Sequence, residues 1–188
     1  GFGRFKQWRG PAVEDTWNGK PTLDFEGVPQ WGEFAVLLSL TAGWEGYAVE
    51  CYGGLRFWKT SPFHPPDRRT TLEPPAHLRD FLERVARANG GNVKLRYGGC
   101  WDLLAWRGDE YRFIEVKRHR RDAVRNTQYQ WFDSARRAGV SASSFVIVEW
   151  IFDSDPPPVF LPTHAVTRKL PLRPDIQANT PVIVHAKR

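Results

Sequence analysis

The chain has 188 residues, of which 41% are hydrophobic, and its 27 Lys and Arg outnumber its 21 Asp and Glu to leave a net charge of +6. This length suits one domain of ordinary size with extensions. The sequence has no apolar run of about 18 residues and no apolar leader, which argues against a membrane span or a secretory signal. The basic balance favours an anionic partner such as nucleic acid.

Two further counts bear on the setting of the chain. The sequence contains no Met, so we expect a trimmed form or a piece of a longer protein. Its two cysteines, Cys51 and Cys100, lack the Cys/His spacing of a zinc site, which predicts a reduced, cytoplasmic setting. We expect both to be small buried side chains.

The first third of the chain predicts an irregular segment followed by a helix and two strands. Residues 1–30 are rich in Gly, Pro and polar residues without a clear period, which indicates an extended arm or an irregular cap. The apolar residues of 31–41 recur at helical spacing and predict a helix. Strands are predicted over 47–52 and 55–59, on either side of a glycine turn.

The middle of the chain predicts a helix and then a hairpin. A proline-rich loop over 60–75 leads into a helix over 76–88, which has a clear apolar stripe. Two strands, 101–107 and 111–118, are joined through Gly108-Asp109, a turn typical of hairpins.

The last third predicts a helix over 126–138 and a strand over 144–150, which is rich in β-branched and aromatic residues. Beyond residue 151 the chain is again rich in proline, and Leu161 and residues 182–184 suggest added edge strands. The order of helices and strands predicts an α/β sandwich with a mixed sheet.

Three chemically active side chains meet on one patch of the predicted hairpin. Alternate residues of a strand share a face, so Glu115 and Lys117 point the same way while Val116 points into the core. Counting outward from the turn places Asp102 opposite Glu115. Two carboxylates and a lysine therefore converge at one end of the sheet.

This combination suits a magnesium site. Adjacent carboxylates repel each other, and Mg²⁺ relieves that repulsion while it also takes waters and a phosphate oxygen as ligands. A lysine beside them can orient or help to deprotonate an attacking water and neutralise charge on a phosphodiester. An isolated pattern of this kind more often marks a cross-strand ion pair on an exposed face, so two further residues matter.

Glu33 lies on or beside the apolar side of the helix over 31–41, where a carboxylate needs a metal or an active-site lysine as partner. The alternative is a position at the edge of the stripe that reaches solvent. Gln128 begins the buried face of the helix that carries Trp131 and Phe132, so its amide also needs partners. A catalytic carboxylate, a water or a phosphate would serve, and so would the backbone at the helix start.

The motif Gly98-Gly99-Cys100-Trp101-Asp102 is followed by Phe113-Ile114-Glu115-Val116-Lys117, and then by Gln128-Tyr129-Gln130-Trp131-Phe132 and Gly139. This order resembles the VRR-NUC branch of the PD-(D/E)XK nucleases. The pattern of that family is a Gly-x-Pro-Asp strand, a Glu-Val-Lys strand and a helix with Gln three residues before a Trp or a similar residue. Trp101 departs from it, since it stands where the family usually has Pro.

The resemblance implies a restriction-endonuclease-like core of order α-β-β-β-α-β, with a mixed central sheet, over residues 31–150. It implies an insertion at about 53–92, an N-terminal arm over 1–30 and a C-terminal extension over 151–188. It also implies hydrolysis of DNA phosphodiester bonds that depends on Mg²⁺, for which Mn²⁺ would substitute.

The resemblance further implies roles for the site residues. By analogy, Asp102, Glu115 and the backbone carbonyl of Val116 would ligate the metal, and Lys117 would serve the water nucleophile. Glu33 matches the acidic residue that the superfamily often carries on its first core helix, and it would support the metal or the phosphate together with Gln128.

A cluster of cations follows Lys117 and would clamp a phosphate beside the scissile bond. The other interpretation is a solvated loop. The residues expected to contact nucleic acid are Arg118, His119, Arg120, Arg121 and Arg125. His119 would also suit a general base, although a phosphate contact or a solvent-facing position is favoured.

The sequence has no helix-turn-helix, zinc-finger, RNA-recognition or P-loop signature. We therefore expect structure- or end-directed cleavage of DNA, or of RNA, in repair, recombination, phage or defence settings. Two alternatives stay open: a catalytically silent nucleic-acid-binding module of the same fold, and a subunit that docks a partner protein or a second copy through its terminal extensions. No membrane contact is predicted, and a nucleoid or phage setting is compatible with the cytoplasmic location.

Overall fold

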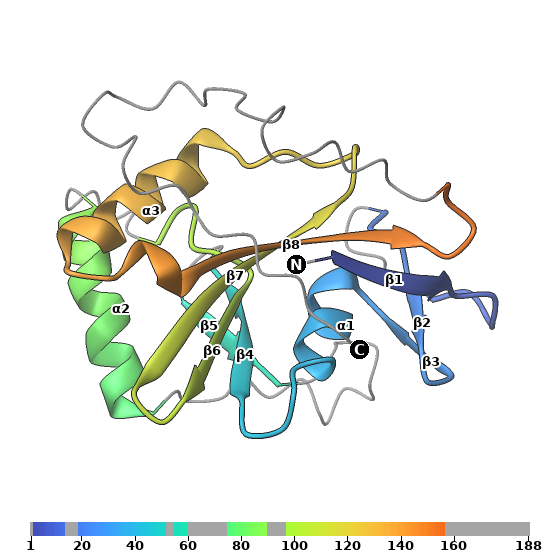
Figure 1. Cartoon of the computed structure of the whole chain (residues 1–188), viewed down its shortest axis with the longest axis horizontal. Helices are drawn as coiled ribbons and strands as arrows, with labels where there is room; N and C mark the ends of the chain where they lie inside the picture. The colour runs from blue at the N-terminus through green and yellow to red at the C-terminus, as the bar shows by residue number, and fades with distance from the viewer. Residues whose placement is uncertain (1, 14–18, 52–54, 60–74, 90–96, 157–188) are drawn as a thin grey trace.

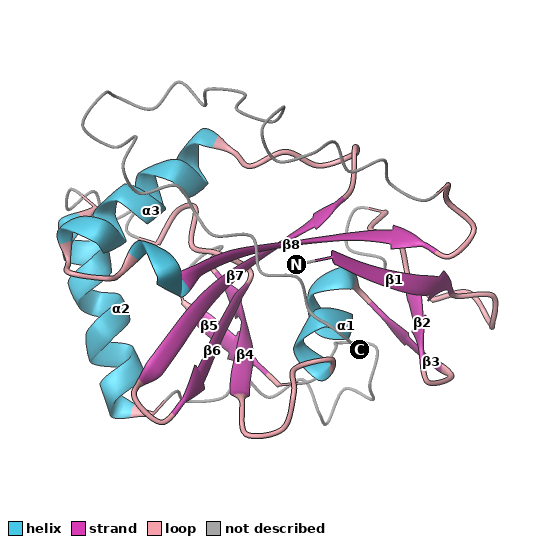
Figure 2. Cartoon of the chain, viewed as in Figure 1, coloured by secondary structure: helices cyan, strands magenta, loops and turns pink. Residues whose placement is uncertain are grey.

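The computed structural model describes residues 2–13, 19–51, 55–59, 75–89 and 97–156, which form one mixed sheet and three α-helices (Figure 1). The sheet has eight strands in the order β3-β2-β1-β8-β7-β6-β4-β5 (Figure 2). The predicted α/β class with a mixed sheet is confirmed. Within the described ranges, no helix combines the length and the apolar character needed to cross a membrane.

The strands are β1 (Phe2–Gln7), β2 (Leu23–Phe25), β3 (Val28–Gln30), β4 (Glu45–Glu50), β5 (Arg56–Trp58), β6 (Leu103–Arg107), β7 (Glu110–Arg118) and β8 (Phe145–Phe152). The helices are α1 (Gly32–Leu38), α2 (Ala76–Ala88) and α3 (Asn126–Arg137). Every helix and strand predicted within the described ranges is present. The predicted bounds of α2 are confirmed, whereas α1 is shorter than predicted.

The hairpin of β6 and β7 has the predicted register, since Leu103 pairs with Ile114 and Arg107 with Glu110. Strand β8 then pairs with β7 in parallel, which sets Lys117 beside Glu149. Antiparallel and parallel pairs therefore meet at β7, the strand that carries Glu115.

Apolar side chains are buried on both faces of the sheet. On one face α2 and α3 cover a cluster that includes Leu82, Trp131 and Phe145 (Figure 1). On the other face α1 covers a cluster that includes Phe34 and Ile114. Each fully buried Leu or Phe side chain contributes about 1.5–3 kcal/mol, so the two clusters hold β6 and β7 from both sides.

The expectation of an irregular segment over residues 1–30 is wrong where the structure has β1, β2 and β3, because these three stretches are strands of the sheet. Strand β1 pairs with β8 in parallel, and β2 and β3 form a short antiparallel hairpin beside it. The ring of Phe5 meets Trp150 edge-on, at 6.5 Å between centroids. Two of these strands have only three residues, and β1 pairs with a strand at the far end of the described chain, so no local period announces them.

The stretch 53–92, expected to be an insertion, contributes β5 to the sheet and α2 to the helical layer where it is described. Most of the predicted loop over 60–75 lies outside the described residues. The edge strands predicted at Leu161 and over 182–184 lie outside them too.

Candidate active site

Asp102 immediately precedes β6 and is held by the two neighbouring strands. The backbone N–H of Val116 donates to its Oδ2 at 2.8 Å, and the N–H of Val49 donates to its carbonyl oxygen, also at 2.8 Å. The carboxylate therefore lies beside the segment of β7 that carries Glu115 and Lys117, where the predicted pairing places it.

Glu115 is the most deeply buried charged residue of the site, with 0% of its side chain exposed. Its Oε1 lies 2.6 Å from the Nζ of Lys117 and also accepts a hydrogen bond from the side-chain amide of Gln128. Its Oε2 is buried and has no hydrogen-bond partner among the described residues. A buried charged oxygen without a partner is expensive, at more than about 1–3 kcal/mol, so Glu115 has one oxygen ready for a ligand.

The charge state of Asp102 responds to this crowding. Burial raises the pKa of Asp102 well above its usual value of 3.8, and the negative charges of Glu115 and Glu33 raise it further. The hydrogen bond from Val116 and the ammonium of Lys117 lower the pKa only in part. A divalent cation would favour the ionised form of Asp102, since it supplies positive charge beside the carboxylate.

Gln128 uses both ends of its amide, so both sequence interpretations hold. Its Oε1 accepts from the N–H of Arg125 at 2.8 Å and caps the start of α3. Its Nε2 donates to Glu115. The start of the helix is thereby linked to the Glu115 carboxylate.

The turn before Asp102 packs directly on that helix start. Gly99 has φ +82°, and a Cβ built there would lie 2.0 Å from the carbonyl oxygen of Thr127. Trp101 is 3% exposed and donates from Nε1 to the carbonyl of Gln128 at 3.3 Å. Trp101 therefore links the strand entry to α3.

Glu33 lies in the first turn of α1, and its partner is a lysine, but not the one on β7. Its carboxylate forms an ion pair with Lys20, which lies between β1 and β2. The charge of Glu33 still reaches the site, because it raises the pKa of Asp102. In the described part of the chain, no three His, Cys, Asp or Glu side chains are grouped closely enough to hold a metal by themselves.

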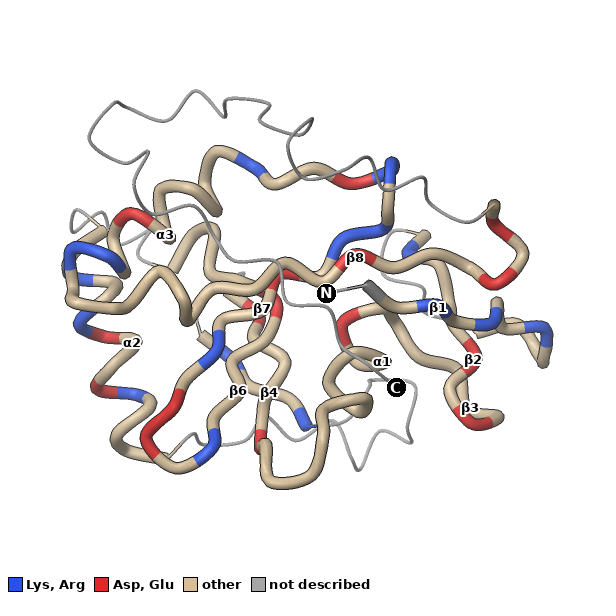
Figure 3. The backbone as a smooth tube through the Cα atoms, in the orientation of Figure 1, with Lys and Arg blue, Asp and Glu red and all other residues tan. Residues whose placement is uncertain are grey.

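The predicted basic cluster divides into engaged and exposed cations. The guanidinium of Arg118 lies 4.7 Å from the ring centroid of Phe152 and 5.6 Å from that of Trp150. His119 Nδ1 lies 2.9 Å from Glu149 Oε2. Figure 3 shows the charged residues along the loop from β7 to α3. The members of the cluster exposed on the surface are Arg120, Arg121 and Arg125.

Sequence reasoning missed two charged residues near the site, Lys20 and Glu149. The sequence could have pointed to Glu149, because this carboxylate shares a strand face with the buried Phe145 and with Ile147, which packs against the same cluster. Lys20 had no such signal, since nothing in the polar stretch around it indicates contact with α1.

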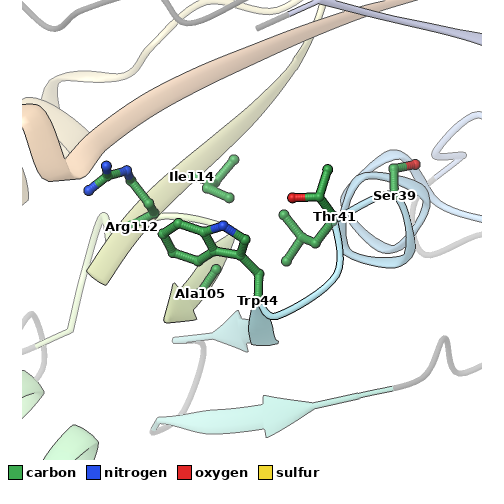
Figure 4. A pocket seen from close by; sticks show the side chains of 7 residues that line it. Ser39, Thr41, Trp44, Ala105, Arg112 and Ile114 are labelled. Atoms are coloured by element: carbon green, nitrogen blue, oxygen red, sulfur yellow. The ribbon is translucent and has the colours of Figure 1, made fainter. Parts of the chain in front are cut away.

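Figure 4 shows an apolar cavity whose lining includes none of the site residues described above. It has a volume of about 180 Å³ and lies on the face of the sheet that α1 covers. The indole of Trp44 is part of its wall and lies between Arg112 and Thr41 (Figure 4). The lining consists of Ser39, Leu40, Thr41, Trp44, Ala105, Arg112 and Ile114.

Comparison of the chain with protein-family models, with curated proteins and with solved structures found no match. The interpretation of the site therefore depends on its own residues and their geometry.

Proposed function

We propose that this chain is a metal-dependent nuclease of the PD-(D/E)XK type, similar to the VRR-NUC branch, with a restriction-endonuclease-like core. The observation that carries the proposal is Glu115, fully buried, with one oxygen bound by Lys117 and Gln128 and the other without a partner among the described residues. Asp102 beside it has a raised pKa, so the two carboxylates favour a shared cation.

The donor set fits a hard divalent cation such as Mg²⁺ or Mn²⁺. Asp102, Glu115 and the carbonyl of Val116 would hold it, with Glu33 in a supporting place, and this agrees with the preference of Mg²⁺ for one or two carboxylates plus waters. When bound, the cation would polarise a phosphoryl oxygen and lower the pKa of the attacking water.

The other residues of the site would orient the attacking water and the Glu115 carboxylate and neutralise charge on the phosphate. Lys117 lies 2.6 Å from Glu115 with its side chain 10% exposed, so its ammonium is confined at the carboxylate pair. From there it orients the attacking water and offsets charge that develops on the phosphate. Gln128 holds Glu115 against α3, so the carboxylate keeps its direction during the reaction.

The substrate that we propose is DNA, with RNA as the alternative. Arg120, Arg121 and Arg125 are exposed on the loop and helix start next to the site, where they would contact phosphates. Contacts of this kind position a strand without reading its bases, so we propose cleavage directed by the structure or the end of the DNA.

The test is cleavage of labelled single-stranded, duplex, flap and four-way DNA, with matched RNA, in Mg²⁺, Mn²⁺ or EDTA. The chain is compared with Lys117→Ala and with Lys6→Ala, an exposed lysine of β1. We expect metal-dependent cutting that Lys117→Ala lacks and Lys6→Ala keeps.

Binding of DNA without cutting in any metal would contradict catalysis by this chain alone. It would favour a silent nucleic-acid-binding module or a subunit that requires a protein partner. Cutting that survives Lys117→Ala would place the active site elsewhere.

A further inference from the structure

Lys20 reaches the candidate site from outside the segments that carry the motif. Its Nζ forms an ion pair with Glu33 and lies 5.3 Å from the ring centroid of Trp31. Trp31 is the residue before α1 and is 2% exposed, and the side chain of Glu33 is 18% exposed. Lys20 therefore contacts a buried residue and a largely buried one, although 46% of its own side chain is exposed.

The position of this contact is fixed by the sheet. Strand β1 pairs with β8, and the start of α1 packs on the same strand, since a Cβ on Gly32 would lie 2.7 Å from Nε1 of Trp150. Leu23, at the start of β2 and just after Lys20, is fully buried against the α1 side of the sheet. The N-terminal strands and the helix that carries Glu33 are thus held by one strand.

The charges of the site do not cancel. Its carboxylates are Asp102, Glu115 and Glu33, and two lysines pair with them, Lys117 with Glu115 and Lys20 with Glu33. Asp102 has a backbone N–H as its hydrogen-bond donor and no ion pair within the described residues. Each lysine removes one negative charge that would otherwise attract a divalent cation.

We propose that Lys20 is a positioning residue that sets the cation affinity of this site by neutralising Glu33. The proposal rests on the proposed function. Oxygen sites tune their cation affinity by the number of negative ligands, so Lys20 weakens the binding of the cation to the free protein. A phosphodiester brings its own negative charge, and the cation is then held jointly by protein and substrate.

A purely structural role for Lys20 gives the opposite expectation. If the lysine only tethers the N-terminal strands, its removal loosens Glu33 and leaves cation affinity unchanged or weaker. If it acts through charge, its removal tightens cation binding. Lys20→Arg keeps the charge and separates the two.

The experiment is calorimetric titration of the full chain with Mn²⁺, without nucleic acid, for the wild type, Lys20→Met, Lys20→Arg and Glu115→Gln. Arg9→Met, an exposed cation of the same N-terminal region, is the matched control. We expect Lys20→Met to bind Mn²⁺ about two- to fivefold more tightly, as for a half-exposed and partly screened charge. Lys20→Arg and Arg9→Met should bind as the wild type does.

Unchanged or weaker binding by Lys20→Met, with a melting temperature equal to that of the wild type, would overturn the role of Lys20 and leave the proposed function standing. A wild type that binds no Mn²⁺, or binds it equally well as Glu115→Gln, would refute the metal site of the proposed function itself. The two failures are therefore distinguishable.

Discussion

Replacing Gly99 by Ala tests the contact that joins the strand entry to α3. The new Cβ would lie 2.0 Å from the carbonyl oxygen of Thr127 and 2.8 Å from the backbone nitrogen of Gln128, and neither is the end of a flexible side chain. The turn of residues 97–100 or the helix start must therefore move. Because Gln128 binds Glu115, we expect the displacement to reach the Glu115 carboxylate.

The magnitude has two parts. An L side chain at φ +82° costs about 1–2 kcal/mol, and the clash adds about 1–3 kcal/mol for an overpacked site. The expected decrease is about 2–5 kcal/mol of unfolding free energy. At about 2–4 °C per kcal/mol for a chain of this size, the melting temperature should fall by about 4–20 °C.

Gly139→Ala is the matched control, since Gly139 follows the same helix, has φ +92° and has nothing within 4 Å of its built Cβ. It should show only the backbone part, about 1–2 kcal/mol, and keep nuclease activity. Thermal melting and the cleavage assay are run on both variants below their melting temperatures. If Gly99→Ala had the same melting temperature as Gly139→Ala and cleaved DNA at the wild-type rate, the inferred contact between the turn and the helix would be refuted.

Three other predictions concern the site. The pKa of Asp102 is raised in the folded protein, so its contribution to stability is present below its usual value of 3.8 and is lost as pH rises through the folded pKa. Without metal, Asp102→Asn should therefore have a higher melting temperature than the wild type at neutral pH, and the difference should shrink toward acid pH. An equal difference at all pH values would count against the crowding of negative charge around Asp102. Gln128→Met should lower kcat about ten- to a hundredfold with a smaller effect on melting, and unchanged kcat would show that Glu115 needs no support. The double variant Arg120→Ala, Arg121→Ala should weaken DNA binding. It should also lower the slope of log binding constant against log salt concentration by about 0.9 for each phosphate that is no longer neutralised, whereas Arg87→Ala on α2 should leave this slope unchanged. Equal slopes for the double variant, Arg87→Ala and the wild type would show that the phosphate-binding surface lies elsewhere.

The hairpin was predictable because its information is local. A Gly-Asp turn and alternating side chains determine the register, so the pairing of Leu103 with Ile114 and the neighbourhood of Asp102 and Glu115 follow without knowledge of the rest of the fold. The partners of Gln128 were predictable as a class, because a buried amide at a helix start must be satisfied.

The contacts of Lys20 and β1 were not predictable, since they join segments far apart in the chain. Glu33 needed a partner, but the sequence alone does not show which lysine lies beside it; in the structure this partner is Lys20. The hydrogen bond from Trp101 to Gln128 was not predictable either, because it depends on the position of α3.

The parallel pairing of β1 with β8 also sets an order of events during synthesis. Strand β1 is made before the other described strands, yet its partner residues, Glu149 to Phe152, come near the end of the described chain. Such long-range pairing forms late, after the local hairpins and helices. Strand β1, which precedes Lys20, therefore gains its partner β8 only when nearly the whole described chain has been made. A nascent chain would carry Asp102 and Glu115 before β1 has its place in the sheet.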